Sequence, residues 1–577
     1  MFRRTGLLAS AIVAVSALAV ATAGAVTFGD WRQFGENAQH QGFVNVAGQP
    51  LNNILDDVVY DPFTTQENTS SGIAVHYQTA LDGGDVYMES KSGTLTNTKN
   101  WKTQVWNEDK LSWQSGKLVR QWTFASDWKP VPFSKNPDSG PTSEPVFHAV
   151  LANDSVYVPG VGGTVFRVDP LNGTAVRINP FGSSIDKHLA VAGALSVDGS
   201  GNVYYNAVKL HSSNPWGHDV DGAWLVKIAS DNSTATATWA SITPGTPAPT
   251  DRCTVSFSAA VLPWPPSPTA VAPTVPCLSQ RPGINVAPAI APDGTIYDIS
   301  RAQGSDRWGY LIAVNPDLTS KWVASLRNRF SDGCNVALPP NGTPDGCRAG
   351  ASTGVDPAEN EPGSGRVVDN STSSPTVAPD GSVLYGAYTR YNYAQGHLMR
   401  FSSAGLYLGS YHSGSDITPA IYSHSATYSV VIKDNQYGNL GSYCDNPTYC
   451  APDRNATNPS NPEVYFITQL DPGLAVEWKF QNTNTQSCTR NADGSVTCVP
   501  GPAHGFEWSN DALAIDKNGV VYANSADGNL YAINQGGTLK QNIFLERAVK
   551  ASGTPLSIGA DGKIYAQNFG QLVPVGS

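Results

Sequence analysis

The residues of this chain best suited to contact a ligand are aromatic, imidazole and charged side chains in the connections between its repeated segments. They are Trp216, His218, Asp219, Trp308, Arg327, Arg329, His504 and Trp508. Aromatic rings and guanidinium groups stack on flat ligands and on one another. The set therefore predicts an aromatic-walled mouth for a sugar or another planar ligand. The competing interpretation is that each ring packs beneath its own loop, since long loops need small cores of their own.

Motifs for catalysis or metal binding are sparse. Residues 218–222 read H-D-V-D-G, which resembles the start of a calcium loop but lacks the later ligands. The sequence shows no G-x-S-x-G, H-E-x-x-H, G-x-G-x-x-G or P-loop pattern. We therefore assign no catalytic residue, predict no metal site and favour a protein that is not an enzyme.

The eight cysteines group as four pairs of near neighbours in sequence, and none falls in the first 250 residues. Closing a short loop costs little chain entropy, so neighbours are the favoured partners. We predict the disulfides Cys253–Cys277, Cys334–Cys347, Cys444–Cys450 and Cys488–Cys498. Metal ligation is the alternative, but no C-x-x-C spacing supports it.

The elements that position these residues are short strands. Residues 511–575 contain the same pattern twice: a small-apolar strand, a D-x-N-G or A-D-G turn, then V-V-Y-A or K-I-Y-A, a second turn and another strand. Alternating apolar residues between Gly, Asp and Asn turns predict antiparallel strands. Similar units recur from about residue 75 onward. Such repetition predicts an all-β fold, a single β-propeller.

We expect eight four-stranded blades, with seven or nine as alternatives, closed by an N-terminal strand. The last repeat has three strands, and the W-x-x-F pattern of Trp31 to Phe34 resembles the fourth-strand segment that contains Trp478 and Phe480. Pairing of residues 31–34 with the last blade would remove two open edges. The predicted long loops, at 243–285, 327–372, 435–463 and 482–509, all follow a second or fourth strand. They are therefore expected on one face, where binding sites are commonly built.

A family resemblance follows from the repeat. The A-P-D-G-x-[IV]-Y pattern at 291–297 and the D-P-G pattern at 471–473 resemble the quinoprotein (PQQ-type) propeller repeat. That superfamily includes quinone-dependent dehydrogenases and non-enzymatic scaffolds, such as a subunit of the outer-membrane assembly machinery. The resemblance implies PQQ and Ca²⁺ for an active dehydrogenase. Many such enzymes have two adjacent cysteines, and this chain has none. It resembles the scaffolds more than the dehydrogenases.

Composition and the first residues bear on compartment and partners. Residues 1–25 have Arg3 and Arg4, an apolar run and A-x-A sites, which predict a signal peptide, with the propeller at 26–577. The formal net charge of −11 disfavours nucleic acid as a partner. No later stretch is predicted to span a membrane. We expect a secreted or periplasmic monomer.

Three functions are compatible with these observations. The first is a secreted non-enzymatic propeller, without a cofactor, that binds a protein or polysaccharide partner on its long-loop face. The alternative is a PQQ-dependent dehydrogenase that oxidises an alcohol or sugar. The third is a polysaccharide-cleaving propeller, which would need paired carboxylates across the channel.

Overall fold

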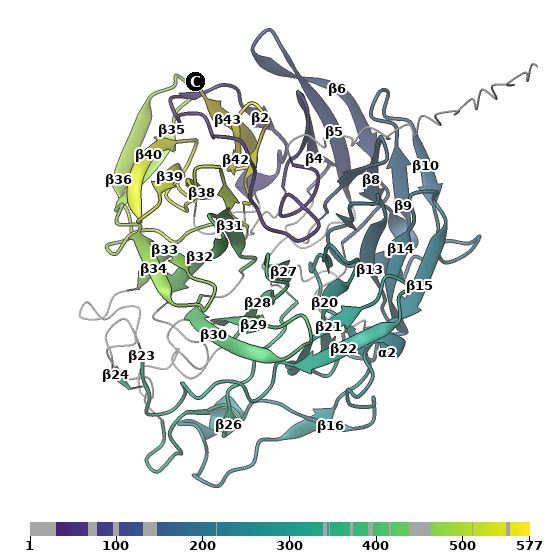
Figure 1. The fold of residues 1–577 in the computed structure, drawn as a ribbon, viewed down its shortest axis with the longest axis vertical. Coiled ribbons are helices and arrows are strands. Elements are labelled where there is room, and N and C mark those ends of the chain that lie inside the picture. Colours follow the sequence, from purple (N-terminus) through teal and green to yellow (C-terminus); the bar gives the residue numbers. More distant parts are fainter. Residues whose placement is uncertain are drawn as a thin grey trace, which may run out of the picture.

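The computed structural model is a ring of eight antiparallel blades (Figure 1), which confirms the all-β propeller prediction. The chain runs around the ring in sequence order, so the first and last blades are neighbours. The structure describes residues 31–66, 78–95, 103–130, 147–214, 216–338, 343–344, 347–369, 373–389, 396–414, 417–437, 463–510, 512–549 and 554–577. The predicted signal peptide lies outside these residues.

The first four blades follow one pattern, from the inner strand to the outer strand. Blade 1 contains β3 (Ala80–Asp82), β4 (Asp85–Gly93), β5 (Gln104–Gln114) and β6 (Lys117–Ala125). Blade 2 contains β7 (Val150–Ala152), β8 (Ser155–Pro159), β9 (Val165–Val168) and β10 (Ala175–Ile178). Blade 3 contains β12 (Ser196–Val197), β13 (Val203–Lys209), β14 (Gly222–Ile228) and β15 (Thr234–Thr238), and β11 (Leu189–Val191) also pairs with β13. Blade 4 contains β19 (Ala289–Ile290), β20 (Ile296–Ala302), β21 (Ser305–Val314) and β22 (Ser320–Ser325), and β18 (Gln280–Pro282) also pairs with β20.

The remaining blades repeat the same order. Blade 5 contains β27 (Thr376–Val377), β28 (Val383–Tyr388), β29 (Gly396–Phe401) and β30 (Tyr407–Ser413). Blade 6 contains β31 (Ala420–His424), β32 (Thr427–Gln436), β33 (Val464–Leu470) and β34 (Val476–Gln481). Blade 7 contains β37 (Ala514–Ile515), β38 (Val521–Asn524), β39 (Asn529–Asn534) and β40 (Thr538–Phe544). Blade 8 contains β41 (Ser557–Ile558), β42 (Ile564–Asn568) and β43 (Gln571–Gly576).

The A-P-D-G segments form the tight turns between first and second strands. At Asp293 and Asp380, a carboxylate oxygen accepts the backbone N–H two residues later, in both cases at 2.9 Å. Gly294 and Gly381 have positive φ, which glycine adopts without strain. Second strands such as β42 are fully buried, whereas outer strands such as β6 are largely exposed. The core therefore lies between neighbouring blades.

The outer strand of blade 8 comes from the N-terminal region, but not from the predicted residues. β1 (Asn53–Ile54) and β2 (Val58–Val59) both pair antiparallel with β43. The prediction that Trp31 to Phe34 forms this strand is wrong. Trp31 instead makes a bridge with Leu81 in blade 1, and both Trp31 and Phe34 are almost fully buried. An outer strand has one face toward solvent, so it could not bury these side chains in this way.

Residues 31–49, which we call the inner segment, run through the middle of the ring and contact the blades in order. Backbone hydrogen bonds join it to blade 1 (Trp31 with Leu81), blade 2 (Arg32 with Leu151), blade 4 (Ala38 with Ile290), blade 5 (Gln39 with Val377), blade 6 (Gln41 with Ile421), blade 7 (Gly42 with Ile515) and blade 8 (Gln49 with Gly562). The Gln33 side chain makes two hydrogen bonds to the backbone of Val197 in blade 3. The inner segment therefore satisfies polar groups at the inner edge of every blade.

The channel at the level of the inner strands is filled by side chains of this segment. Phe34 packs in a cluster with Ala194, Ala287 and Ala512, which come from opposite parts of the ring. The rings of His40 and His148 approach Phe34 edge-on, at 5.5 and 6.1 Å between centroids. Small alanines around one phenylalanine allow close packing of the kind found in protein cores.

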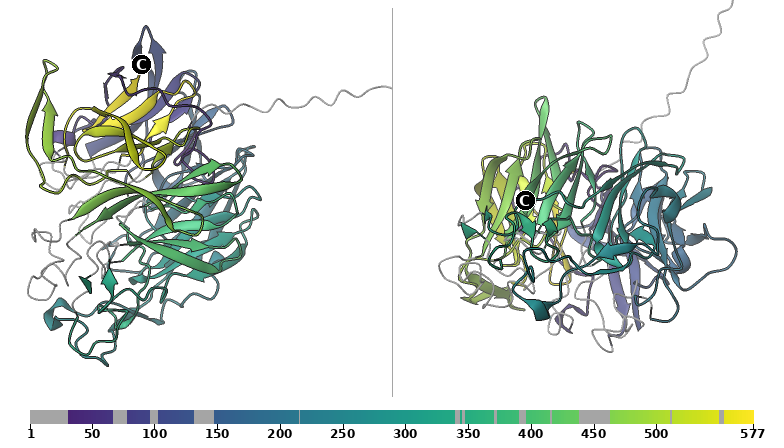
Figure 2. Two further views of the ribbon diagram at one scale, coloured as in Figure 1. Left: turned by 60° about the vertical axis from the view of Figure 1, so that its left-hand side comes forward. Right: turned by 90° about the horizontal axis from the view of Figure 1, so that it is seen from below.

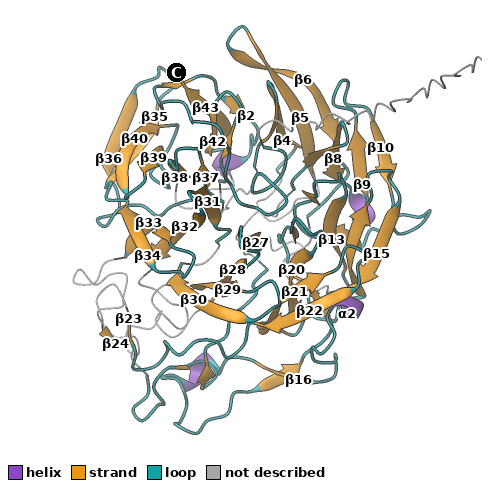
Figure 3. Ribbon diagram, viewed as in Figure 1, coloured by secondary structure: helices purple, strands orange, loops and turns teal. Residues whose placement is uncertain are grey.

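Short hairpins lie outside the ring. They are β16 (Arg252–Thr254) with β17 (Thr274–Pro276), β23 (Ala337–Leu338) with β24 (Thr343–Pro344), β25 (Val355–Asp356) with β26 (Glu361–Pro362), and β35 (Gln486–Arg490) with β36 (Val496–Pro500). In the described part of the chain the helical pieces include η2 (Val161–Gly163), α2 (Trp239–Ile242), η3 (Ala259–Val261) and residues 64–66, and strands dominate (Figure 3). Among the described residues, no helix has the length and apolar character needed to cross a membrane.

Candidate binding face

The long loops share one face of the ring. Because consecutive strands of each blade are antiparallel, the connections from second to third strand and from outer strand to the next blade leave from the same edge. The loops at 243–285, 327–372 and 482–509 are all connections of the latter kind. Figure 2 shows the teal loops projecting from the ring. We call this the long-loop face, and we call the opposite side, with its short turns, the turn face. Most of the fourth predicted loop, 435–463, lies outside the described residues.

Three of the four predicted disulfides are present on this face. They are Cys253–Cys277, Cys334–Cys347 and Cys488–Cys498. The predicted pair Cys444–Cys450 lies outside the described residues. Cys253 and Cys277 are fully buried beside Ala302 of blade 4, so this bond anchors its loop to the ring as well as closing it.

The loops after blades 3 and 4 pack against each other as one unit, which we call the loop lobe (residues 243–279 and 327–364). Phe257, Trp264, Ala272 and Ala358 form a small apolar core between them. The backbone N–H of Phe257 donates to the carbonyl of Ala358 at 2.9 Å, and that of Arg348 donates to Trp264 at 2.9 Å. Two loops from successive blades therefore share a core, as expected for loops that hold a fixed shape.

Buried ion pairs attach the loop lobe to blade 4. The Arg307 guanidinium on β21 lies 2.6 Å from Asp356 and 3.5 Å from Glu359, two carboxylates that are fully buried in the lobe. Asp306, next to it, pairs with Arg366. Burial alone would raise the pKa of the Asp306 carboxyl, but the positive charges of Arg366 and Arg301 outweigh it and lower the pKa to about 2. The Asp306 carboxylate therefore stays ionised at neutral pH.

Four of the predicted ligand-binding residues come together at the base of the loop lobe. Asp219 accepts hydrogen bonds from the backbone N–H and the hydroxyl of Ser279, both at 2.8 Å. The Trp308 indole N–H donates to Thr254 at 3.2 Å, and the Arg327 guanidinium lies 4.4 Å from the Trp308 ring centroid. Trp216 lies under the guanidinium of Arg281. These contacts brace the lobe, and direct contact of the four residues with a ligand stays a prediction.

The other four predicted residues are separate from this group. His218 is exposed, with its ring 4.4 Å from that of His211. Arg329 lies over Tyr407 at 5.3 Å, and His504 is half-buried after β36. Trp508 is 1% exposed, in the core between blades 6 and 7 with Phe480 and Tyr531. Its indole is therefore a packing element in this structure.

A pocket on the turn face has no counterpart in the sequence predictions. Its volume is about 740 Å³, and the inner segment and the turns of blades 2, 3 and 4 line it with polar groups such as Arg32, Asp198, Lys227 and Asp293. The pocket forms only when the inner segment meets these turns, and they lie far apart in the chain. No local sequence pattern could therefore have indicated it.

The filled channel also bears on the quinone that the repeat resemblance implies. Dehydrogenases of that type stack the quinone over the central channel, but in the described part of this chain Phe34 and its alanine neighbours occupy the inner-strand level. Phe34 and the three alanines are apolar, and the buried imidazoles of His40 and His148 lie beside Phe34. At the inner-strand level, these described residues form a packed core.

The comparisons with known proteins concern the fold. No family model matches the chain, and no curated protein is similar to it in sequence. Similar solved structures include quinohemoprotein alcohol dehydrogenase from Comamonas testosteroni, with 14% identity over 96% of this chain and 78% of that chain and a TM-score of 0.47. BamB from Moraxella catarrhalis has 10% identity over 91% and 99% of the two chains, with a TM-score of 0.36. Sqt1 from Saccharomyces cerevisiae has 8% identity over 92% and 100%, with a TM-score of 0.42. These proteins resemble the chain in the propeller arrangement alone.

Proposed function

We propose that the protein is an extracytoplasmic, non-enzymatic propeller that binds a protein or polysaccharide partner on its long-loop face. The observation that carries this proposal is the loop lobe. Loops of this length are usually mobile, but here a shared core, disulfides and buried ion pairs hold them in place. Their rigidity lowers the entropy cost of binding, because a fixed surface does not have to be ordered by its partner.

Exposed apolar side chains on this face support a binding role. Val271 in the loop lobe is 86% exposed, and Val496 and Val499 of the β35–β36 hairpin are 44% and 55% exposed. Within the described chain, β36 pairs with β35 alone. The other edge of β35 faces residues 546–548, where Arg490 and Cys488 form backbone hydrogen bonds. The outer edge of β36 therefore offers backbone donors and acceptors next to apolar side chains. A partner could bind such an edge by adding a strand to it.

The compartment and the class of partner follow from the same features. Disulfides form and persist in oxidising compartments outside the cytosol. The net charge of −11 supports a partner other than nucleic acid. The proposed partner is therefore a protein or a polysaccharide.

The test compares matched variants of the two faces. Val496→Asp with Val499→Asp changes the long-loop face, and Leu171→Asp with Leu406→Asp changes exposed leucines in turns of the opposite face. A glycan array and capture from an envelope extract identify candidate partners, whose affinities are then measured with purified components. We expect the long-loop variant to weaken binding at least tenfold and the turn-face variant to leave it unchanged. The reverse pattern, or equal losses, would refute the assignment of this face.

A further inference from the structure

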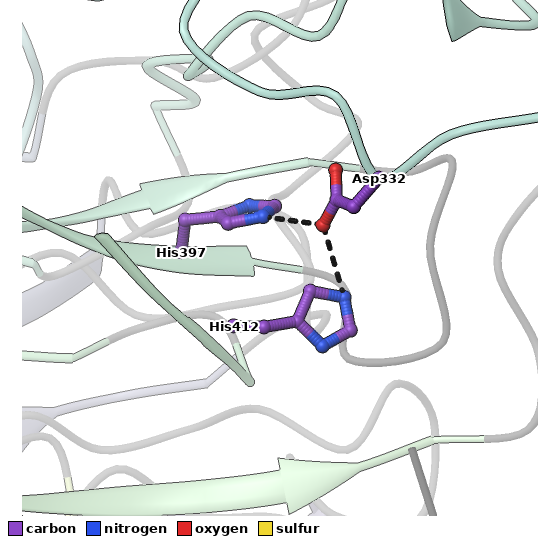
Figure 4. A group of neighbouring side chains, drawn as sticks. All are labelled: Asp332, His397 and His412. Atoms are coloured by element: carbon purple, nitrogen blue, oxygen red, sulfur yellow. Dashed lines mark hydrogen bonds and ion pairs between the residues drawn. The ribbon is translucent and has the colours of Figure 1, made fainter. Parts of the chain in front are cut away.

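Two histidines and one aspartate meet where the loop lobe reaches blade 5 (Figure 4). His397 lies on β29 and His412 on β30, and their Cα atoms are direct partners across the two strands. Asp332 comes from the loop after blade 4. Its Oδ2 lies 2.7 Å from His397 Nε2 and 3.4 Å from His412 Nε2, and Figure 4 shows both rings turned toward it. The three potential ligand atoms lie within 4.8 Å of one another.

This donor set suits a zinc-type ion. Zn²⁺ binds imidazole nitrogens and carboxylate oxygens at about 2.0–2.2 Å in tetrahedral geometry, which places ligand atoms about 3.3 Å apart. The His412–Asp332 distance of 3.4 Å already has this spacing, and the His397–Asp332 distance of 2.7 Å would have to open slightly. We propose that Asp332, His397 and His412 bind a divalent ion of the zinc class, with water or a partner group as fourth ligand.

The imidazole of His397 is held in the orientation that ligation requires. The Phe330 ring stacks on it at 3.8 Å with an interplanar angle of 7°. Its Nδ1 lies 3.3 Å from the hydroxyl of Thr389. When Nδ1–H donates to this hydroxyl, Nε2 carries the lone pair and points toward Asp332 and His412. Metal-binding histidines commonly use the second ring nitrogen in this way.

Asp332 is also fixed in place, although it lies on a loop. Two residues later, Cys334 forms the disulfide to Cys347 and donates its backbone N–H to Val355 at 2.9 Å. Two residues earlier, Phe330 pairs with Gly363. A ligand set held by packing and hydrogen bonds needs little rearrangement to bind an ion. Side-chain exposures of 15% for His412 and 20% for Asp332 leave a path for the ion.

The simpler interpretation is that Asp332 and His397 form an ion pair that attaches the loop to the blade. The two interpretations differ in what they require of His412. An ion pair between Asp332 and His397 does not need the second imidazole, whereas an ion of the zinc class would use both. In the proposed arrangement the ion links the loop lobe to blade 5. The conformation of the long-loop face would then depend on the concentration of the metal ion.

The experiment uses the mature protein after treatment with a chelator. Zn²⁺ binding is measured by calorimetry and by elemental analysis after gel filtration, and Co²⁺ serves as a spectroscopic probe because its visible absorption reports tetrahedral ligation. We expect one bound ion per chain. His412→Gln, which changes a partly exposed side chain, should weaken the affinity at least 100-fold and remove the Co²⁺ spectrum. His397→Gln should do the same, with folding checked by circular dichroism.

The matched control is the pair His211 and His218. Their rings lie 4.4 Å apart, His218 is exposed and His211 is half-buried, and they belong to no three-residue ligand group among the described residues. His211→Gln with His218→Gln should leave the stoichiometry and the affinity unchanged. Absence of stoichiometric Zn²⁺ binding by the parent protein, or equal affinity in folded His412→Gln, would refute the site. Loss of the ion in the control variant would place the binding elsewhere and would also refute it.

Discussion

The Arg281 guanidinium donates two parallel hydrogen bonds to the Asp369 carboxylate, at 2.7 and 2.6 Å. Arg301 donates a third, at 3.0 Å, and the Arg281 side chain is 1% exposed. Although burial alone would raise it, the pKa of Asp369 is lowered by these two arginines. One carboxylate therefore compensates two largely buried positive charges at the base of the long-loop face.

Removal of this carboxylate should be costly. Asp369→Asn leaves Arg281 and Arg301 close together without the carboxylate to which both donate, and breaking a buried pair in this way costs about 3–5 kcal/mol. Asp293→Asn is the control, because its pair with Lys321 at 3.4 Å is largely exposed and should contribute under about 1 kcal/mol. Urea denaturation measures both. Similar losses in the two variants would contradict the importance of burial here.

The phenylalanine in the channel should contribute strongly to stability. Phe34→Ala leaves a cavity between Ala194, Ala287 and Ala512, and such truncations cost about 3–5 kcal/mol. Leu171→Ala, at an 85% exposed position, should change stability by no more than about 0.5 kcal/mol. The denaturation midpoints of the two variants, each compared with the parent protein, measure these losses of stability. A small effect of Phe34→Ala would mean that the inner segment is not a structural part of the ring.

Closure of blade 8 should depend on the backbone near β1. The Leu55 N–H donates to the carbonyl of Pro574 at 2.9 Å. Leu55→Pro removes this donor and should lower the free energy of unfolding by at least about 1 kcal/mol, with increased aggregation from the open edge of β43. Leu55→Ala keeps the N–H and isolates the side-chain contribution. Equal behaviour of the two variants, by thermal melting and light scattering, would argue against the hydrogen bond.

The disulfides should differ in their resistance to reduction. Cys253 and Cys277 are fully buried, whereas Cys498 is exposed on β36. A thiolate must reach a sulfur atom to break the bond. Under mild reductant we expect Cys488–Cys498 to open first and Cys253–Cys277 last. Timed alkylation with peptide mapping follows each pair, and also tests the predicted Cys444–Cys450 bond. Simultaneous opening without unfolding would contradict the expectation.

Acid should weaken the filled channel. Burial lowers the pKa of His40, and also that of His148, to about 4. A histidine in an unfolded chain titrates near a pKa of about 6.5, so the unfolded state binds more protons between these values. The contribution of these two histidines to stability is therefore largest above about pH 6.5 and falls as the pH drops toward 4. His40→Asn, which keeps a donor toward Pro375, should flatten this decline in melting experiments. An unchanged pH profile would show that His40 does not cause it.

Much of the fold could be predicted because turn chemistry is local. The Asp and Gly of A-P-D-G, as at Asp293 and Gly294, define a turn whatever surrounds them. The W-x-x-F pattern at Trp31 is different, because it does not specify its partner. Trp31 pairs with Leu81 and not with β43, because this position buries its side chain inside the ring.

The contacts of the loop lobe and of the proposed metal site were harder to predict, because they join residues that are distant in sequence. Arg307 and Asp356 are 49 residues apart, and Asp332 and His397 are 65 apart. Pairing of the three described disulfides was predictable, since each closes a short loop. One local signal existed for the histidines: His397 and His412 lie on either side of the turn at residues 402–405, at positions that pair across it. The aspartate had no such signal.

The path of the inner segment has a consequence for biosynthesis. During translation, residues 31–49 emerge before the blades, but their partners extend from Leu81 to Gly562, so the segment cannot complete its contacts until the last blade has been made. β1 and β2 must likewise wait for β43. Contacts this far apart in sequence form slowly, so ring closure and channel filling should coincide in one late step. A nascent chain that is released early would have an unpaired N-terminal segment and an open ring. Its exposed strand edges would make it a substrate for chaperones and proteases.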